Sequence, residues 1–150
     1  MSDFSQHLPV AIGCDHAGYE LKEALKLQLE KTGWTVQDVG THNKDSVDYP
    51  DFAHPVANSV EKGEAAFGVL ICGSANGVSI TANKHAGIRA GLCWNDEVAK
   101  LVRLHNNANI ICLPARFISQ EEALQLLETF IETPFEGGRH ATRVGKISCT

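Results

Sequence analysis

Five short apolar segments, each separated from the next by a stretch of helical periodicity, constrain the fold of this chain most strongly. They are rich in β-branched residues, which is typical of buried strands, and comprise residues 8–14, 34–39, 68–72, 88–93 and 110–113. Strands that alternate with helices through short loops favour right-handed crossovers and a parallel sheet covered on both faces. The sequence therefore predicts one domain over residues 1–150, a three-layer α/β/α Rossmann-like fold with a five-stranded parallel sheet.

The segments between the strands predict helices. Residues 19–31 are amphipathic, and Gly33 follows them as a C-cap. Four more helices are predicted at residues 50–60, 79–84, 96–104 and 120–132, the last with Ser119 and Glu122 in a capping box. The basic tail, residues 137–147, is too short to form a core of its own. It is suited to docking on a partner.

Composition narrows the class of protein. A net charge of −5 over 150 residues argues against general nucleic-acid binding, and no apolar run reaches the ~18 residues of a membrane span. The start of the chain does not resemble a secretion signal, so we expect a cytoplasmic protein with neither a nucleic-acid nor a membrane partner. The five cysteines form no C-x-x-C pair, and no two histidines have metal-ligand spacing. Neither disulfides nor a metal are predicted.

Parallel sheets bind ligands beyond the carboxyl ends of their strands. That rule selects Asp15 and His16, residues 72–77, residues 94–96, and Arg116. Residues 72–77 belong to a longer segment, residues 68–79, that reads as a strand, a small polar loop and the start of a helix. Successive N–H groups and the helix dipole favour binding of an anion at such a loop. The same groups would lower the pKa of the Cys72 thiol and prepare it to act as a base or a nucleophile. The alternative is that Cys72 is a small buried apolar residue and the glycines only shape a turn.

Two common nucleotide motifs are absent. The loop lacks both G-x-x-x-x-G-K-[ST] and G-x-G-x-x-G, which argues against a nucleoside triphosphatase and a dinucleotide enzyme. In the tail, Arg139, His140 and Arg143 lie within about one helical turn of each other and are placed to converge on a phosphate. The alternative is a solvated basic tail.

Motifs along nearly the whole chain together resemble the ribose-5-phosphate isomerase B family, which also includes galactose-6-phosphate isomerase subunits. They are the segments around Cys14-Asp15-His16, Asp48-Tyr49-Pro50, residues 71–84, residues 87–90, residues 104–109, and Arg139-His140-x-x-Arg143. The resemblance implies an aldose–ketose isomerase that interconverts ribose 5-phosphate and ribulose 5-phosphate through an enediolate, without metal or cofactor. It implies a homodimer or homotetramer with active sites shared between chains.

The resemblance also implies residue roles. Cys72 takes the place of the base, Ser74 that of a proton relay, and His105 that of the group that opens the sugar ring. Substrate-binding roles are implied for Asp15, His16, Tyr49, Gly73, Ala75, Asn76, Gly77, Asn106, Arg116, Arg139 and Arg143. Within that set, the arginines and His16 hold phosphate, and the N–H groups of residues 73–77 stabilise the enediolate.

Some of these residues also have purely structural interpretations. His16 can be a satisfied strand-end histidine, Asp15 a helix cap, Tyr49 a packing residue, and His105 a helix C-terminal residue favoured by the dipole.

Val78 stands where one branch of the family has a glutamate base. Ala75 stands where many members have glycine, so a left-handed backbone there would cost about 1–2 kcal/mol.

Two alternative functions remain open at this point. One is an isomerase of a six-carbon phosphosugar, allose or galactose 6-phosphate. The other is a non-catalytic module that binds phosphometabolites with the same loop and arginines. Proton exchange at the sugar distinguishes both isomerases from the binding module.

Overall fold

The computed structural model describes residues 2–149 and confirms the predicted five-stranded parallel sheet. Its strands are β1 (Val10–Cys14), β2 (Val36–Asp38), β3 (Phe67–Cys72), β4 (Ala90–Leu92) and β5 (Ile110–Pro114), in the order β2-β1-β3-β5-β4 across the sheet. The edge strands β2 and β4 are shorter than predicted. Trp34 and Ile88 are buried as expected but lie outside the paired segments.

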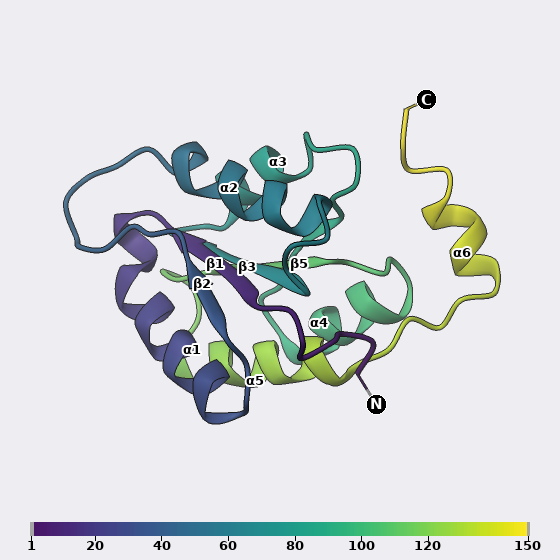
Figure 1. Ribbon diagram of the computed structural model, residues 1–150, viewed down its shortest axis with the longest axis horizontal. Coiled ribbons are helices and arrows are strands. Elements are labelled where there is room, and N and C mark those ends of the chain that lie inside the picture. Colours follow the sequence, from purple (N-terminus) through teal and green to yellow (C-terminus); the bar gives the residue numbers. More distant parts are fainter. Residues whose placement is uncertain (1, 150) are drawn as a thin grey trace.

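The helices cover both faces of the sheet. The helices on the sheet are α1 (Tyr19–Lys31), α2 (Pro50–Glu61), α3 (Asn76–Ala82), α4 (Asp96–Leu104) and α5 (Gln120–Glu132), and a further helix, α6 (Arg139–Val144), lies apart from it. Figure 1 shows α2 and α3 on one face of the sheet and α1, α4 and α5 on the other. The apolar core divides accordingly: Leu25 and Phe130 pack against Phe67 on one face, while Val56 and Val78 pack with Leu70 on the other. The predicted three layers are therefore confirmed.

The start of α3 differs from its prediction. The apolar pattern indicated a helix from Ser79, whereas α3 begins at Asn76. Ala75, immediately before it, has φ 64° and ψ −1°, and this left-handed residue turns the chain directly into the helix. Asn76 and Gly77, the first two residues of α3, carry no apolar side chain, so the apolar pattern does not reveal them.

The tail has no core of its own, as predicted. An extended segment after α5 leads to α6, which stands away from the rest of the molecule in Figure 1. His140 is the one buried residue of this helix. Docking of the tail on a partner stays a prediction. Among residues 2–149, no helix is long and apolar enough to cross a membrane.

Candidate active site

The strand order places the candidate site between β1 and β3. The chain leaves β1 towards β2 on one side of the sheet, and it leaves β3 towards β4 on the other. Ligands of parallel α/β sheets bind outside the carboxyl ends of the strands where the connections diverge in this way. Asp15 follows β1 there, and its N–H donates to the carbonyl oxygen of Ile71 in β3 at 3.3 Å. The residues after these two strands are thus adjacent.

Cys72 is the last residue of β3 and lies at the rim of the core beneath α2 and α3. It is 5% exposed and belongs to the apolar cluster that contains Ala75 and Val78. Three other cysteines are fully buried, and burial raises the pKa of Cys14, Cys93 and Cys112 to about 12 each. Those three thiols stay protonated at neutral pH and are poor nucleophiles.

The loop after Cys72 presents unused backbone donors. No group of residues 2–149 accepts a hydrogen bond from the N–H of Gly73, Ser74 or Gly77. The N–H of Asn76 is occupied, because it donates to the Ser74 hydroxyl at 3.3 Å. The left-handed turn at Ala75 and the start of α3 hold these donors in one small region. The predicted anion-binding character of the loop therefore rests on Gly73, Ser74 and Gly77.

Tyr49 and Arg116 lie against the two glycines of this loop. A Cβ atom on Gly77 would come within 2.5 Å of the Tyr49 ring, and one on Gly73 within 3.2 Å of the Arg116 side chain. Glycine is therefore required at position 77 for Tyr49 to occupy its place. The structure thus brings Cys72, the loop, Tyr49 and Arg116 together.

Asp15 and His16 join this group, and each also has a structural contact. Asp15 is 8% exposed and its Oδ1 accepts from the N–H of Ala17, so it caps the short 3₁₀ turn His16–Gly18. His16 Nδ1 accepts from the N–H of Val47 at 3.2 Å, which ties down the loop between β2 and α2. This bond leaves Nε2 as the protonated nitrogen of the neutral ring, a donor suited to a phosphate or hydroxyl oxygen.

Four predicted site residues lie at the opposite, amino edge of the sheet: His105, Asn106, Arg139 and Arg143. Residues 105–109 lead into Ile110, the first residue of β5, whereas Cys72 is paired with Pro114, the last. At about 3.3 Å per residue, β5 alone separates the two edges by about 13 Å. Figure 1 shows α6 on the opposite side of the molecule from the loop of residues 39–49. One chain therefore does not bring these four residues to Cys72.

His140 does not join the arginines of the tail, contrary to the sequence interpretation. Arg139 and Arg143 are exposed, while His140 is buried and stacks on His105 with ring centroids 4.1 Å apart and planes 10° from parallel. Glu136 lies beside both rings, and the sequence analysis missed it. The only signal in the sequence that could have indicated Glu136 is its spacing of four residues from His140.

The residues selected after β4 have structural roles. Asn95 caps α4 by accepting from the N–H of Val98, and Asp96 accepts from the Thr129 hydroxyl. Trp94 remains exposed and, with Ser74 and Phe117, lines a shallow hollow next to the loop.

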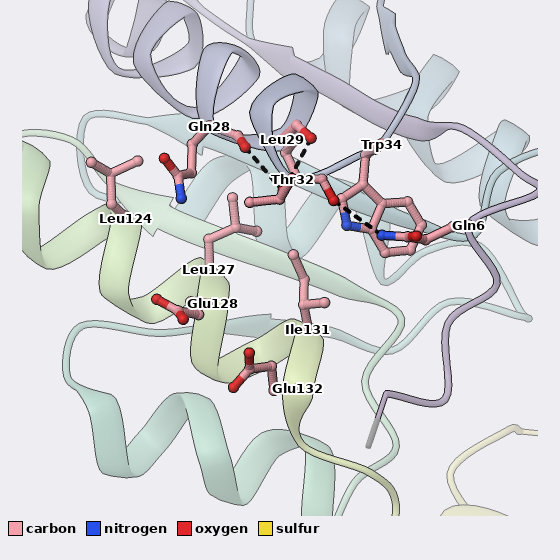
Figure 2. Close-up of a pocket in the computed structure, with 10 residues that line it drawn as sticks. All are labelled: Gln6, Gln28, Leu29, Thr32, Trp34, Leu124, Leu127, Glu128, Ile131 and Glu132. Atoms are coloured by element: carbon pink, nitrogen blue, oxygen red, sulfur yellow. Dashed lines mark hydrogen bonds between the residues drawn. The ribbon is translucent and has the colours of Figure 1, made fainter.

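A separate groove lies between α1 and α5, on the face of the sheet away from Cys72. Figure 2 shows Leu29, Leu127 and Ile131 along it, with Trp34 at one end and Glu128 and Glu132 on the α5 side. No predicted site residue lines this groove. It forms no part of the candidate site.

Comparison with known proteins identifies close relatives. Residues 10–147 match the protein family described as Ribose/Galactose Isomerase. The ribose-5-phosphate isomerase B of Escherichia coli is 41% identical over 139 residues, which are 93% of this chain and 93% of that protein. The ribose 5-phosphate isomerase of Thermotoga maritima superposes with a TM-score of 0.93 at 49% identity, covering 96% of this chain and 99% of that one. The ribose-5-phosphate isomerase B of Mycoplasma genitalium, solved with bound ribulose 5-phosphate, superposes with a TM-score of 0.90 at 39% identity, covering 93% of each chain.

Proposed function

The chain belongs to the ribose/galactose isomerase family, and we propose that it interconverts ribose 5-phosphate and ribulose 5-phosphate. One observation carries the proposal: the Cys72 thiol ends β3 beside a loop with unused N–H donors, where the sheet connections diverge. The Escherichia coli relative is a ribose-5-phosphate isomerase, and the Mycoplasma genitalium structure holds ribulose 5-phosphate. Both support this pair of sugars.

The chemistry requires a base and an oxyanion site. In the direction from aldose to ketose, the Cys72 sulfur as thiolate removes the proton from carbon two of the open-chain aldehyde, which leaves an enediolate. The N–H groups of Gly73, Ser74 and Gly77 stabilise its oxygen. The Ser74 hydroxyl moves a proton between the two sugar oxygens, and the thiol returns its proton to carbon one. The ketose forms with no net gain or loss of protons.

Phosphate and sugar binding use the remaining residues. His16 and Arg116 supply a donor and a positive charge at the carboxyl edge. Tyr49, which is 39% exposed against Gly77, covers the loop, and the Asp15 carboxylate accepts from sugar hydroxyls. The unused N–H groups of Gly73, Ser74 and Gly77 complete this half of the site.

The second half is supplied by a second copy of the chain. His105, Asn106, Arg139 and Arg143 lie too far from Cys72 of their own chain, and both arginines are exposed on a helix that stands off the molecule. Trp94 and Phe117 are 53% and 75% exposed beside the loop, which offers apolar surface to a partner. We expect at least a homodimer in which the partner's tail and the end of its α4 complete each site, with His105 opening the ring and the tail arginines holding phosphate.

Deuterium incorporation tests the proposal. Incubation with ribose 5-phosphate in deuterated water and chelator should place deuterium at carbon one of the ribulose 5-phosphate formed, where the thiol exchanges its proton with solvent before returning it. The reverse reaction should then place deuterium at carbon two of ribose 5-phosphate. Cys72→Ala should lower kcat by about 10²–10⁴-fold, the usual contribution of a general base, while phosphosugar affinity stays largely unchanged. Cys149→Ala, which removes an exposed thiol, is the control and should keep full activity. Full turnover in Cys72→Ala would exclude the thiol as the base, and tight binding without exchange would indicate a binding module.

The family description also favours one alternative substrate class, the six-carbon phosphosugars. An extra carbon lengthens the span between the phosphate and the reacting carbons. The ratio of kcat/KM for ribose 5-phosphate to that for allose or galactose 6-phosphate decides between them, and we expect it to favour the five-carbon sugar.

A further inference from the structure

Three metal-ligating side chains meet where α4, the α5–α6 segment and α6 join. His105 follows the end of α4, and Glu136 is held there because its N–H donates to the carbonyl oxygen of Leu104 at 3.0 Å. His140 comes from α6. One ligand atom from each of the three residues lies within 4.8 Å of the other two. Tertiary packing forms this cluster, since the two histidines are 35 positions apart in the sequence.

One member of the cluster is buried without a partner. His140 is 5% exposed, and within residues 2–149 its Nε2 atom makes no hydrogen bond. The nearest carboxylate oxygen, Glu136 Oε2, is 4.0 Å from that nitrogen and 3.8 Å from His105 Nε2, both too long for hydrogen bonds. A buried polar atom left in this way is uncommon, and a bound ion is one explanation.

We propose that His105, Glu136 and His140 form a site for a divalent transition-metal ion, with Zn²⁺ as the best chemical match. Two imidazoles and one carboxylate are a ligand set that zinc uses when a fourth position is left to water. With bonds of 2.0–2.2 Å, tetrahedral ligand atoms lie about 3.4 Å apart. Each histidine nitrogen therefore approaches the carboxylate oxygen, now 3.8 and 4.0 Å away, by about half an ångström. The widest pair of ligand atoms, which are within 4.8 Å of each other, closes by at most about 1.4 Å.

The surroundings suit this contraction. His140 is 5% exposed, so its ring is held in place by the residues around it. The rings of His105 and His140 are stacked with planes 10° from parallel, so one ring has to turn for both to coordinate one ion. The His105 side chain is 39% exposed and Glu136 is 56% exposed, and both are free to rotate towards the fixed His140.

The site has a consequence for activity that rests on the proposed function. A metal bound to His105 withdraws the imidazole that opens the sugar ring in the partner's pocket. The ion is thus a reversible inhibitor, and metal and phosphosugar weaken each other's binding. The binding itself does not depend on the proposed reaction.

Co²⁺, whose tetrahedral complexes absorb visible light, is the probe. The protein carries Cys149→Ser throughout, since that thiol is exposed and would also bind the ion. We expect one Co²⁺ per chain, with a tetrahedral spectrum and displacement by Zn²⁺. Glu136→Gln and His140→Ala should each raise the Kd more than about tenfold, because even outer partners of metal ligands contribute 10–100-fold. Glu136→Gln is a conservative change of an exposed side chain, so it tests binding if His140→Ala fails to fold.

The control is the other imidazole pair of the chain. His54 Nδ1 and His85 Nε2 are 2.7 Å apart on the surface, and His54→Ala should leave Co²⁺ binding unchanged. Wild-type affinity in Glu136→Gln, or loss of binding in His54→Ala, would overturn the site. Zn²⁺ should inhibit turnover of ribose 5-phosphate and EDTA should restore it. If the protein binds Co²⁺ but has no isomerase activity, the metal site is supported and only the proposed function is contradicted. If the ion binds without inhibiting turnover, the proposal that it withdraws His105 from catalysis is overturned.

Discussion

Ala75 holds the backbone conformation that forms the loop after β3. It has φ 64°, and its methyl group is fully buried. An L-residue with a Cβ atom pays roughly 1–2 kcal/mol for this conformation, which glycine avoids. The sequence suggested that alanine stands where glycine is usual, and the structure confirms that the turn is left-handed all the same. The strain is offset by packing of the methyl group within the α2 and α3 cluster.

Replacement of Ala75 by glycine should therefore change stability little. Glycine relieves about 1–2 kcal/mol of backbone strain. This gain is opposed by about 0.5–1 kcal/mol of lost backbone entropy and about 0.8 kcal/mol for the lost burial of the methyl group. We expect the free energy of unfolding in urea to change by less than about 1 kcal/mol. Ala82→Gly is the matched control, because Ala82 is equally buried but helical, and it should cost about 2 kcal/mol. Equal losses at the two positions would show that Ala75 is not strained.

At the scale of elements, the segments predicted best combine periodicity with a cap. The bounds of α1 and α4 agree with the sequence analysis, and α5 starts after a capping box in which Ser119 and Glu122 exchange hydrogen bonds of 3.0 and 3.1 Å. The start of α3 was missed because its first two residues follow a left-handed residue and have no apolar side chain. The lengths of β2 and β4 depend on pairing with neighbours, which apolar runs do not show.

A buried ion pair joins α1 to the short edge strand β2. Lys22 is fully buried with its Nζ 2.6 Å from Asp38 Oδ2, and Lys26 lies 3.5 Å from the same oxygen. Burial by itself raises the pKa of Asp38, but the hydrogen bonds from Lys22 and from the Gly40 N–H outweigh it and leave the pKa below its ordinary value. The carboxylate therefore stabilises the folded state above its ordinary pKa of about 3.9.

Lys22→Met should destabilise the protein by about 3 kcal/mol at pH 7, the lower end for a broken buried pair, because Lys26 remains near Asp38. The difference in free energy of unfolding between wild type and variant should shrink as the pH falls below about 4. Wild type loses the stabilisation from the Asp38 carboxylate as that group becomes protonated. Urea unfolding between pH 3 and pH 7 measures it. Lys44→Met, which removes an exposed pair with Glu20, should have no measurable effect. A difference that grows on acidification would contradict the assignment.

At the scale of the whole molecule, the sequence predicted one half of the site better than the other. The rule that ligands bind beyond carboxyl ends selected Cys72 and Arg116, and the structure places both at the loop after β3. Tyr49, which also lies against this loop, was indicated by the family resemblance alone. The same rule says nothing about His105, which precedes β5, or about α6. Their distance from Cys72 follows from strand register and tail packing, which are long-range properties that no local pattern encodes.

Mixing two inactive variants tests the shared site. If each site takes Cys72 from one chain and His105 from the other, a mixed dimer of Cys72→Ala and His105→Ala chains contains one intact site and one doubly defective site. Half of the dimers are mixed after unfolding and refolding together in equal amounts, so activity should return to about one quarter of wild type. Each variant refolded alone is the control. A mixture as inactive as its components would place both residues in one chain's pocket.

The separation of the two residue groups has a consequence at low abundance. If two chains share each site as proposed, a single chain has no turnover by itself, and the output per molecule falls as the solution is diluted past the point where pairs come apart. Synthesis of the protein would then raise flux more steeply than in proportion to its amount. Under that proposal, the placement of a short helix at the far end of the sheet would make the rate depend on how often two copies meet.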